Sequence, residues 1–210
     1  MIKEFEKRLL SSFILIPIAI FFIFQGTVFF TFFLSILFLV TSYEWFKMNK
    51  KNNLMKIFGI IFLLFSFYTA FVVREFGSNS FLFIIIVCIF TDIGGYVFGK
   101  TFKGPKLTKI SPNKTYSGVI GSFLFSIIAG LFFIKYIDDL GFKTDYQFVT
   151  LLVILLISFI SQIGDLIISY FKRKAKLKDT GKILPGHGGL LDRIDGLVFV
   201  MPIIYLLDKI

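Results

Sequence analysis

Long blocks of apolar residues alternate with short polar segments along this sequence. A window of about 17 to 25 apolar residues is long enough to cross a bilayer as a helix. Such blocks occupy residues 9–24, 28–46, 54–73, 81–98, 116–134, 148–171 and 190–207. The pattern therefore predicts an all-α fold, a polytopic integral membrane helical bundle of about seven transmembrane helices.

The composition agrees with this fold class. Hydrophobic residues make up 56% of the 210 residues and include 31 Phe, which is more apolar surface than one soluble core covers. The single cysteine, Cys88, cannot form an intrachain disulfide and is predicted to be a small buried hydrophobe. The first block has a basic start but no small-residue cleavage site, so we expect a retained membrane anchor.

The positions of the basic residues predict how the chain is oriented. A net charge of +10 could indicate nucleic-acid binding, but most of the 23 Lys and Arg lie in alternate segments between the blocks. The positive-inside rule places these segments and the N-terminus in the cytoplasm. We therefore predict a multi-pass protein of the cell inner (cytoplasmic) membrane with no nucleic-acid partner.

Two acidic residues interrupt the apolar blocks of the first half of the chain. Glu44 adjoins Trp45 near a block end, which favours an interfacial or paired group. Asp92 lies inside the fourth block, where a lone carboxylate is a candidate site residue. Pairing with a lysine of the following loop is the alternative. Gly94 and Gly95 beside it allow another helix to approach closely.

The loop over residues 100–115 is strongly cationic. Lys114 adds positive charge for an anion, and the Ser111 and Thr115 hydroxyls add directed donors, a set that suits a polyphosphate. Thr115 is also predicted to cap the helix that follows. Contact with anionic lipid headgroups is the alternative interpretation of the charge.

Polar residues reappear toward the end of the sixth block and at the start of the seventh. One helical face of the sixth block carries Gln162, Asp165, Ser169 and Lys172. Asp192 and Asp195 are three residues apart and share a face of the next helix. Carboxylates on two helices can hold Mg²⁺ while leaving positions for phosphates. Ion pairing with the nearby Lys and Arg is the alternative.

The loop between these two blocks ends in a glycine-rich run. Gly186, Gly188 and Gly189 permit conformations that place backbone N–H groups around an anion. No Walker A, dinucleotide-binding, HExxH or Cys/His ligand pattern occurs in the sequence. His187 is the only histidine, which excludes a multi-histidine metal site.

The run from Ser169 to Asp195 resembles the signature of phosphatidate cytidylyltransferases, also called CDP-diacylglycerol synthases. It reads Ser-x-Phe-Lys-Arg, four residues, Lys-Asp, and later Pro-Gly-His-Gly-Gly-x-x-Asp-Arg-x-Asp. Gln162-x-Gly164-Asp165 resembles the family's preceding element, and Ser111-Pro-x-Lys114-Thr115 resembles its loop motif. The similarity covers roughly half the chain, and the long signature is highly specific.

The resemblance implies an enzyme of phospholipid biosynthesis, a Mg²⁺-dependent nucleotidyltransferase that converts CTP and phosphatidate to CDP-diacylglycerol and pyrophosphate. It places Mg²⁺ on Asp165 and Asp192, with room for a second cation. The predicted catalytic residues are Asp165, Lys172, Arg173, Lys178, Asp179, His187, Asp192, Arg193 and Asp195. The predicted substrate-binding residues are Asp92, Ser111, Lys114, Thr115, Gln162, Ser169, Gly188 and Gly189. His187 either donates to a phosphate or only locks its loop.

Residues 1–80 are expected to form three N-terminal membrane helices, and residues 81–210 a catalytic membrane domain. Its loops 100–115 and 172–189 are expected on the cytoplasmic side with the active site. The partners implied are CTP, phosphatidate and membrane lipid, and the resemblance suggests a homodimer. Two alternatives stay open: CTP-dependent transfer to another lipid phosphate, or a transporter or flippase, for which we would expect midplane acids and inverted repeats.

Overall fold

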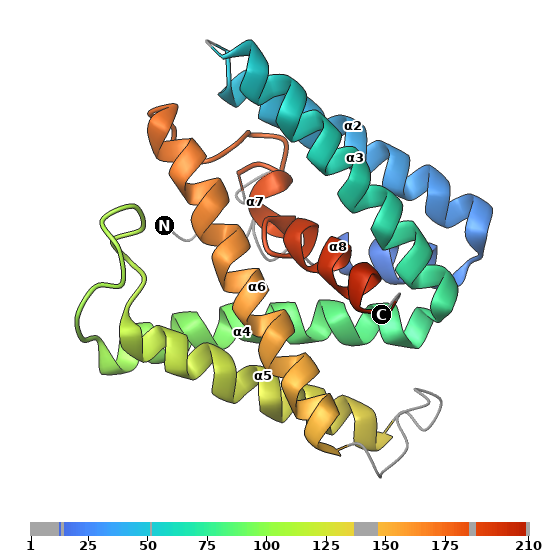
Figure 1. Cartoon of the computed structure of the whole chain (residues 1–210), viewed down its shortest axis with the longest axis vertical. Helices are drawn as coiled ribbons and strands as arrows, with labels where there is room; N and C mark the ends of the chain where they lie inside the picture. The colour runs from blue at the N-terminus through green and yellow to red at the C-terminus, as the bar shows by residue number, and fades with distance from the viewer. Residues whose placement is uncertain (1–12, 14, 51, 137–146, 185–187, 209–210) are drawn as a thin grey trace.

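The computed structural model describes residues 13, 15–50, 52–136, 147–184 and 188–208, and these form a bundle of helices (Figure 1). The long helices are α2 (Thr27–Met48), α3 (Asn53–Phe76), α4 (Ser78–Phe102), α5 (Tyr116–Tyr136) and α6 (Gln147–Lys174). Shorter helices are Leu15–Phe24, α7 (Leu191–Ile194) and α8 (Leu197–Leu207). The described residues contain no β-strand beyond two isolated bridges. The predicted all-α class is confirmed.

The five long helices are each long and apolar enough to cross a membrane. They coincide with five of the predicted blocks. The first predicted block contains the short helix Leu15–Phe24, and the last is divided into α7 and α8 by a turn at Asp195 and Gly196. The structure therefore supports a multi-pass membrane protein with five candidate spans among its described residues.

Local sequence explains where several helices begin. Asn52 caps α3, since its side chain accepts a hydrogen bond from the backbone N–H of Met55 at 3.1 Å. Thr115 caps α5 as predicted, because its hydroxyl accepts from the Gly118 N–H at 3.1 Å. Gly77, between α3 and α4, has φ of 157°, a conformation that glycine adopts at little cost.

Small residues let α4 and α5 pack with their backbones nearly touching. A Cβ added at Gly94 would overlap the Gly121 carbonyl oxygen, and one added at Gly118 would come 2.9 Å from the Gly95 carbonyl oxygen. Interfaces of this kind are typical of membrane helices, where close van der Waals contact replaces a hydrophobic driving force. The predicted role of Gly94 and Gly95 in close helix approach is confirmed.

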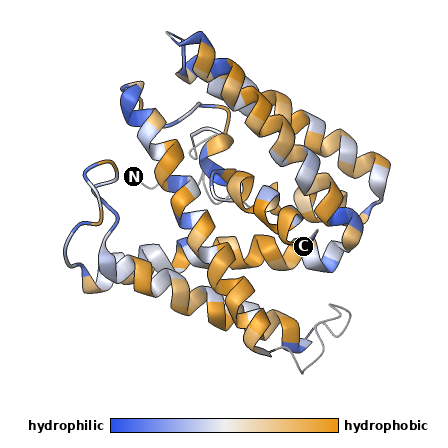
Figure 2. Cartoon of the chain, in the orientation of Figure 1, coloured by the Kyte–Doolittle hydropathy of each residue, from blue (hydrophilic) through white to orange (hydrophobic). Residues whose placement is uncertain are grey.

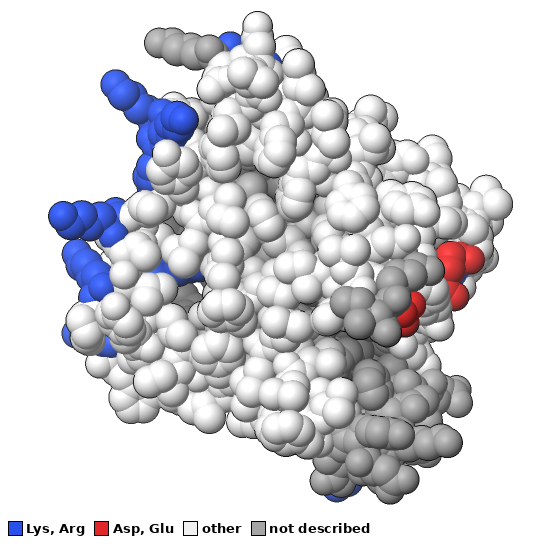
Figure 3. All heavy atoms as spheres, in the orientation of Figure 1, with Lys and Arg blue, Asp and Glu red and all other residues white. Residues whose placement is uncertain are grey.

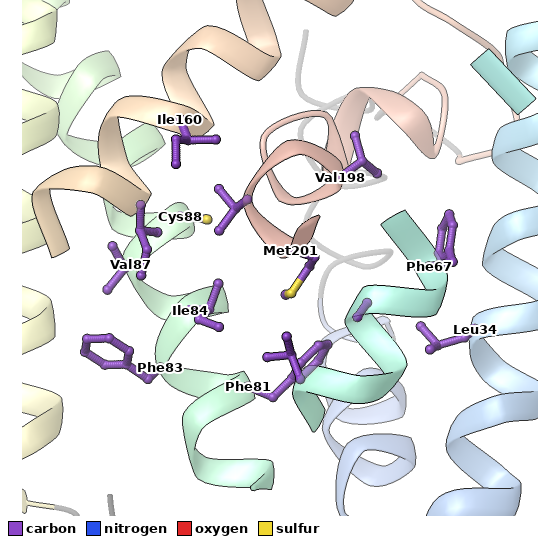
Figure 4. Close-up of a cluster of buried hydrophobic side chains, with 14 of the residues drawn as sticks. Leu34, Phe67, Phe81, Phe83, Ile84, Val87, Cys88, Ile160, Val198 and Met201 are labelled. Atoms are coloured by element: carbon purple, nitrogen blue, oxygen red, sulfur yellow. The ribbon is translucent and has the colours of Figure 1, made fainter. Parts of the chain in front are cut away.

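Several helices, α4 among them, enclose one apolar core. Helix α6 crosses α4 and α5, and α8 lies between α6 and α3 (Figure 1). Buried side chains from several helices meet there, among them Phe67 of α3, Cys88 of α4, Ile160 of α6 and Met201 of α8 (Figure 4). Cys88 is buried, as predicted. The division at residue 80 stays a prediction, and α3 of the first part packs against α8 of the second.

Hydropathy and charge are distributed differently along the bundle. The helices are largely apolar over their length, while polar colours gather at the helix ends and connecting loops (Figure 2). Lys and Arg side chains gather mainly along one edge of the visible face, and the visible Asp and Glu lie toward the opposite edge (Figure 3). The α2–α3 turn, the α4–α5 loop and the end of α6 all reach this basic edge (Figure 1).

Candidate active site

The polar face of α6 forms the centre of the candidate site. The Ser169 hydroxyl donates a hydrogen bond to Asp165 Oδ1 at 3.2 Å, one turn back along the helix. The Gln162 side-chain amide donates to the Ser158 carbonyl at 3.3 Å, one turn back along the same helix. The spacing on α6 predicted that these side chains share a face, and Asp165 and Ser169 do contact each other.

The α4–α5 loop reaches across to this face through Lys114. Lys114 Nζ lies 2.6 Å from Asp165 Oδ2 and 3.4 Å from the Gln162 carbonyl oxygen. The loop is folded back on itself by a hydrogen bond from the Leu107 N–H to the Lys114 carbonyl at 2.8 Å. The basic loop and the acidic face of α6 therefore meet at this contact.

A second ion pair joins α6 to the start of α7. Lys172 Nζ lies 2.8 Å from Asp192 Oδ1, and both side chains are largely buried. Asp192 Oδ2 accepts three further hydrogen bonds, from the Thr180 N–H at 2.7 Å, the Thr180 hydroxyl at 3.0 Å and the Gly189 N–H at 3.1 Å. Asp192 thus holds together the loop between α6 and α7.

Glu44 of α2 binds the same loop from the other side. Its Oε2 accepts hydrogen bonds from the Leu191 N–H at 2.8 Å and the Thr180 hydroxyl at 3.0 Å, and its Oε1 accepts from the Leu190 N–H at 3.0 Å. The residue is only 1% exposed. The sequence predicted that Glu44 is an interfacial or paired group, but it did not place Glu44 at the site. The position of an acidic residue within an apolar block could have indicated such a role.

The glycines of this loop make room for Glu44. A Cβ at Gly189 would lie 2.7 Å from Glu44 Oε2, and one at Gly181 would lie 2.8 Å from the carboxyl carbon of Glu44. Gly188 has φ of 88° and exchanges two backbone hydrogen bonds with Leu184. The glycine-rich run was predicted to surround an anion with N–H groups, and the anions it contacts here are the protein's own carboxylates.

Two further carboxyl groups, those of Asp195 and Asp92, lie near Asp165. Asp165 and Asp195 are within hydrogen-bonding reach of each other, and Asp92 interacts electrostatically with both. Asp195 Oδ1 also accepts a hydrogen bond from the Gly196 N–H at 2.9 Å. The turn can approach α6 because Gly164 has no side chain, since a Cβ there would lie 2.8 Å from the Asp195 carbonyl oxygen.

The other predicted residues occupy varied positions. Arg173 ties the two loops together, donating to the Ile110 carbonyl at 3.4 Å and the Leu177 carbonyl at 3.1 Å. The Ser111 N–H donates to the Thr108 hydroxyl at 3.1 Å. Lys178 and Asp179 are exposed, and Arg193 interacts electrostatically with Asp92. His187 lies outside the described residues, as do Pro185 and Gly186.

The predicted Mg²⁺ ligands can be compared with this geometry. Among the described residues, no three His, Cys, Asp or Glu side chains are grouped for a metal ion. Mg²⁺ is commonly bound by only one or two carboxylates together with water and phosphates. Asp165 fits such a role, since Lys114 is a charge that a cation can replace at Oδ2. Asp192 supplies the same oxygen chemistry, but its oxygens already accept four donors.

Comparison with known proteins identifies relatives of this chain. It is 39% identical over 150 residues to a phosphatidate cytidylyltransferase of Staphylococcus haemolyticus, covering 71% of this chain and 54% of that protein. It is 34% identical over 174 residues to one of Staphylococcus saprophyticus, covering 81% and 65%. It is 41% identical over 138 residues to one of Brucella suis, covering 65% and 49%.

The chain spans about half to two thirds of the length of these relatives. The model of the Cytidylyltransferase family matches residues 53–210, a range that contains both ion pairs described above. Three quarters of the chain therefore match one family over the part where α6, the basic loop and the glycine-rich run converge, and the chain belongs to the cytidylyltransferase family.

Proposed function

We propose that this protein is a phosphatidate cytidylyltransferase, which converts CTP and phosphatidate to CDP-diacylglycerol and pyrophosphate. The contact between Lys114 and Asp165 carries the proposal, because it joins the basic α4–α5 loop to the acidic face of α6. A polyphosphate bound to that loop would lie beside carboxylates suited to a metal ion. The names of the relatives at 34% to 41% identity support the same substrates.

The two substrates would meet at the basic edge of the bundle. CTP is water-soluble and strongly anionic, so a cationic edge outside the bilayer attracts it. Phosphatidate carries its phosphate at headgroup depth, beside the ends of membrane helices. We propose that this edge faces the cytoplasm from the inner membrane, with the N-terminus on the same side and about seven spans in all. We also propose that two copies of this protein form a homodimer.

The reaction is a transfer of the cytidylyl group between phosphate oxygens. A phosphatidate phosphate oxygen attacks the α-phosphorus of CTP, a new P–O bond forms, the bond from that phosphorus to the β-bridging oxygen breaks, and pyrophosphate leaves. A phosphate monoester has a second pKa of about 6, so the attacking oxygen is already ionised near neutral pH. Catalysis therefore depends on positioning and on neutralising charge, and a strong general base is not needed.

The basic side chains supply most of this neutralisation. Lys114 and the Thr115 and Ser111 hydroxyls would contact the phosphates of CTP from the α4–α5 loop. Lys172 and Lys178 would offset charge as point cations, whereas Arg173 can grip a phosphate with two parallel hydrogen bonds. Lys114 and Lys172 are held beside the site by Asp165 and Asp192, so both cations lie close to where the phosphates would bind.

We further propose that the reaction requires Mg²⁺, held by Asp165 and Asp192, with room for a second cation. When bound, the ion would supply Lewis-acid chemistry and offset the negative charge of the phosphoryl group that is transferred. Asp165 is the better placed of the two, because Asp192 also anchors the loop through Thr180 and Gly189. Asp179, Asp195 and Asp92 would orient the cations around them.

One experiment tests the proposal directly. Purified protein in detergent is incubated with phosphatidate and each of the four nucleoside triphosphates, with and without Mg²⁺, and the lipid products are identified by mass spectrometry. CDP-diacylglycerol formed only with CTP and Mg²⁺ is the expected result. A matched arm replaces phosphatidate by an isoprenoid lipid phosphate. If product formed only in that arm, the isoprenoid lipid phosphate and not phosphatidate would be the substrate. If no product formed in either arm, the proposed cytidylyltransferase function would be contradicted.

A further inference from the structure

An apolar cavity of about 390 Å³ lies beside the candidate site. It is enclosed by the short helix Leu15–Phe24, by α2, α3 and α4, and by Leu184 and residues 190–201. Leu34, Phe67, Phe81, Val198 and Met201 line it and surround the same region of the bundle (Figure 4). Among its described lining residues only Ser66 and Arg193 are polar.

One end of the cavity is formed by the loop that carries the site. Leu190 and Arg193 line it, and they flank Asp192, whose carboxylate holds Lys172 and Thr180. Arg193 is the one charged group among the described lining residues, and it lies within electrostatic range of Asp92. The charged residue of the cavity lining therefore lies at the end that adjoins the site.

The other end lies near the opposite ends of these helices. Ile23, Phe30 and Phe81 line this end, and Arg74 donates hydrogen bonds of 3.0 and 2.9 Å to the Ile23 carbonyl. Glu44 binds the loop between α6 and α7 at the site end of α2. Phe30 lies fourteen residues before Glu44 on the same helix, which is about 21 Å along the helix axis at 1.5 Å per residue. The distance along α2 from Phe30 to Glu44 is therefore longer than the thickness of one leaflet of the hydrocarbon core, which is about 15 Å.

The cavity also has an opening on the side of the bundle. Ile16 of the short helix and Ile89 of α4 both line it, yet they are 57% and 46% exposed. On membrane helices, exposed apolar side chains of this kind face lipid tails. A molecule could thus enter sideways from the bilayer without crossing the polar edge of the protein.

We propose that this cavity holds an acyl chain of the lipid substrate, with the anionic headgroup at the end where Arg193 lies. Charge and shape both favour this occupant, because the cavity is apolar along its length and cationic only beside the site. A helix of a second copy, about 10 Å across, would need an open groove, whereas Phe30, Val198 and Met201 are buried. The inference rests on the proposed function, since it names where that reaction's lipid would bind.

Ala70 of α3 allows a direct test, because it lines the cavity and is 7% exposed. Ala70→Leu adds side-chain volume at the wall and therefore reduces the space inside the cavity. The matched control is Ala129→Leu on α5, since Ala129 is also 7% exposed and is not among the lining residues. Activity is measured with phosphatidates of increasing acyl length, together with the KM for CTP.

Ala70→Leu should lower kcat/KM for long-chain phosphatidate about tenfold, as expected when roughly two methylene groups lose their burial. It should change kcat/KM for a six-carbon phosphatidate and the KM for CTP less than about twofold, since neither depends on the far end of the cavity. An unchanged chain-length profile in Ala70→Leu, or the same change in Ala129→Leu, would overturn the acyl-chain site.

A binding measurement separates this inference from the proposed function. Native mass spectrometry of the protein in detergent counts retained long-chain phosphatidate, with phosphatidylcholine of the same chains as competitor. Selective retention that is lost in Ala70→Leu supports the cavity even if no CTP-dependent product forms. Equal displacement by phosphatidylcholine would identify a general lipid site and overturn the assignment to the anionic substrate.

Discussion

Glu44 Oε2 lies 3.0 Å from the Thr180 hydroxyl, although 136 residues separate them in the sequence. That hydroxyl is also 3.0 Å from Asp192 Oδ2. Thr180 therefore stands between two carboxylates, one on α2 and one at the start of α7. Through it, a helix from the N-terminal part of the chain fixes the position of the loop that carries the family signature.

Replacement of Glu44 should loosen this loop. Glu44→Ala leaves the Leu190 and Leu191 N–H groups without their acceptor, and each buried unsatisfied group costs about 1 to 3 kcal/mol. The Thr180 hydroxyl keeps Asp192 as its acceptor. We expect the midpoint of thermal unfolding in detergent to fall by about 5 to 10 °C, and activity to fall even at temperatures where the protein stays folded.

The control for this prediction is Glu75→Gln at the end of α3. Glu75 is more exposed, with 38% of its side chain accessible, and pairs with the adjacent Arg74. Its replacement should change the unfolding midpoint less than Glu44→Ala does, because Gln keeps a carbonyl oxygen for Arg74, and Arg74 also keeps its hydrogen bonds to the Ile23 carbonyl. If Glu44→Ala and Glu75→Gln behaved alike, the loop would not depend on Glu44.

The pair formed by Lys172 and Asp192 should be strongly coupled. The two side chains are 11% and 7% exposed, so removing one partner leaves a charge with little access to water, at a cost of about 3 to 5 kcal/mol. Lys172→Met and Asp192→Asn should each be strongly destabilising. The double variant should be less destabilised than the sum of the two, as measured by a thermal or chemical denaturation cycle. Strict additivity would argue against a direct interaction.

Lys114 should affect CTP more than lipid. Lys114→Ala removes the cation that the α4–α5 loop presents beside Asp165, and we expect the KM for CTP to rise about tenfold, the value of one charge-assisted contact. The KM for phosphatidate should change less than about twofold. Lys109→Ala, an exposed lysine of the same loop, serves as the control. An equal increase in both KM values would argue against a nucleotide role for the loop.

The sequence by itself determined the helices and much of the polar face of α6. Apolar blocks of membrane length predicted the five long helices, because a backbone in lipid must satisfy its hydrogen bonds within each segment. The spacing of Asp165 and Ser169 predicted their contact, because neighbours four apart on a helix face each other. The family signature likewise pointed to the region that the family model matches.

Only the tertiary structure decided which charges pair and which backbone N–H groups Glu44 binds. Lys114 meets Asp165, Lys172 meets Asp192, and Glu44 meets the N–H groups of Leu190 and Leu191. These contacts join segments that are tens to more than a hundred residues apart. Helical periodicity extends only a few turns, so it sets which side chains share a face but not which distant group that face will meet. Packing of α2, α6 and the site loop made that choice.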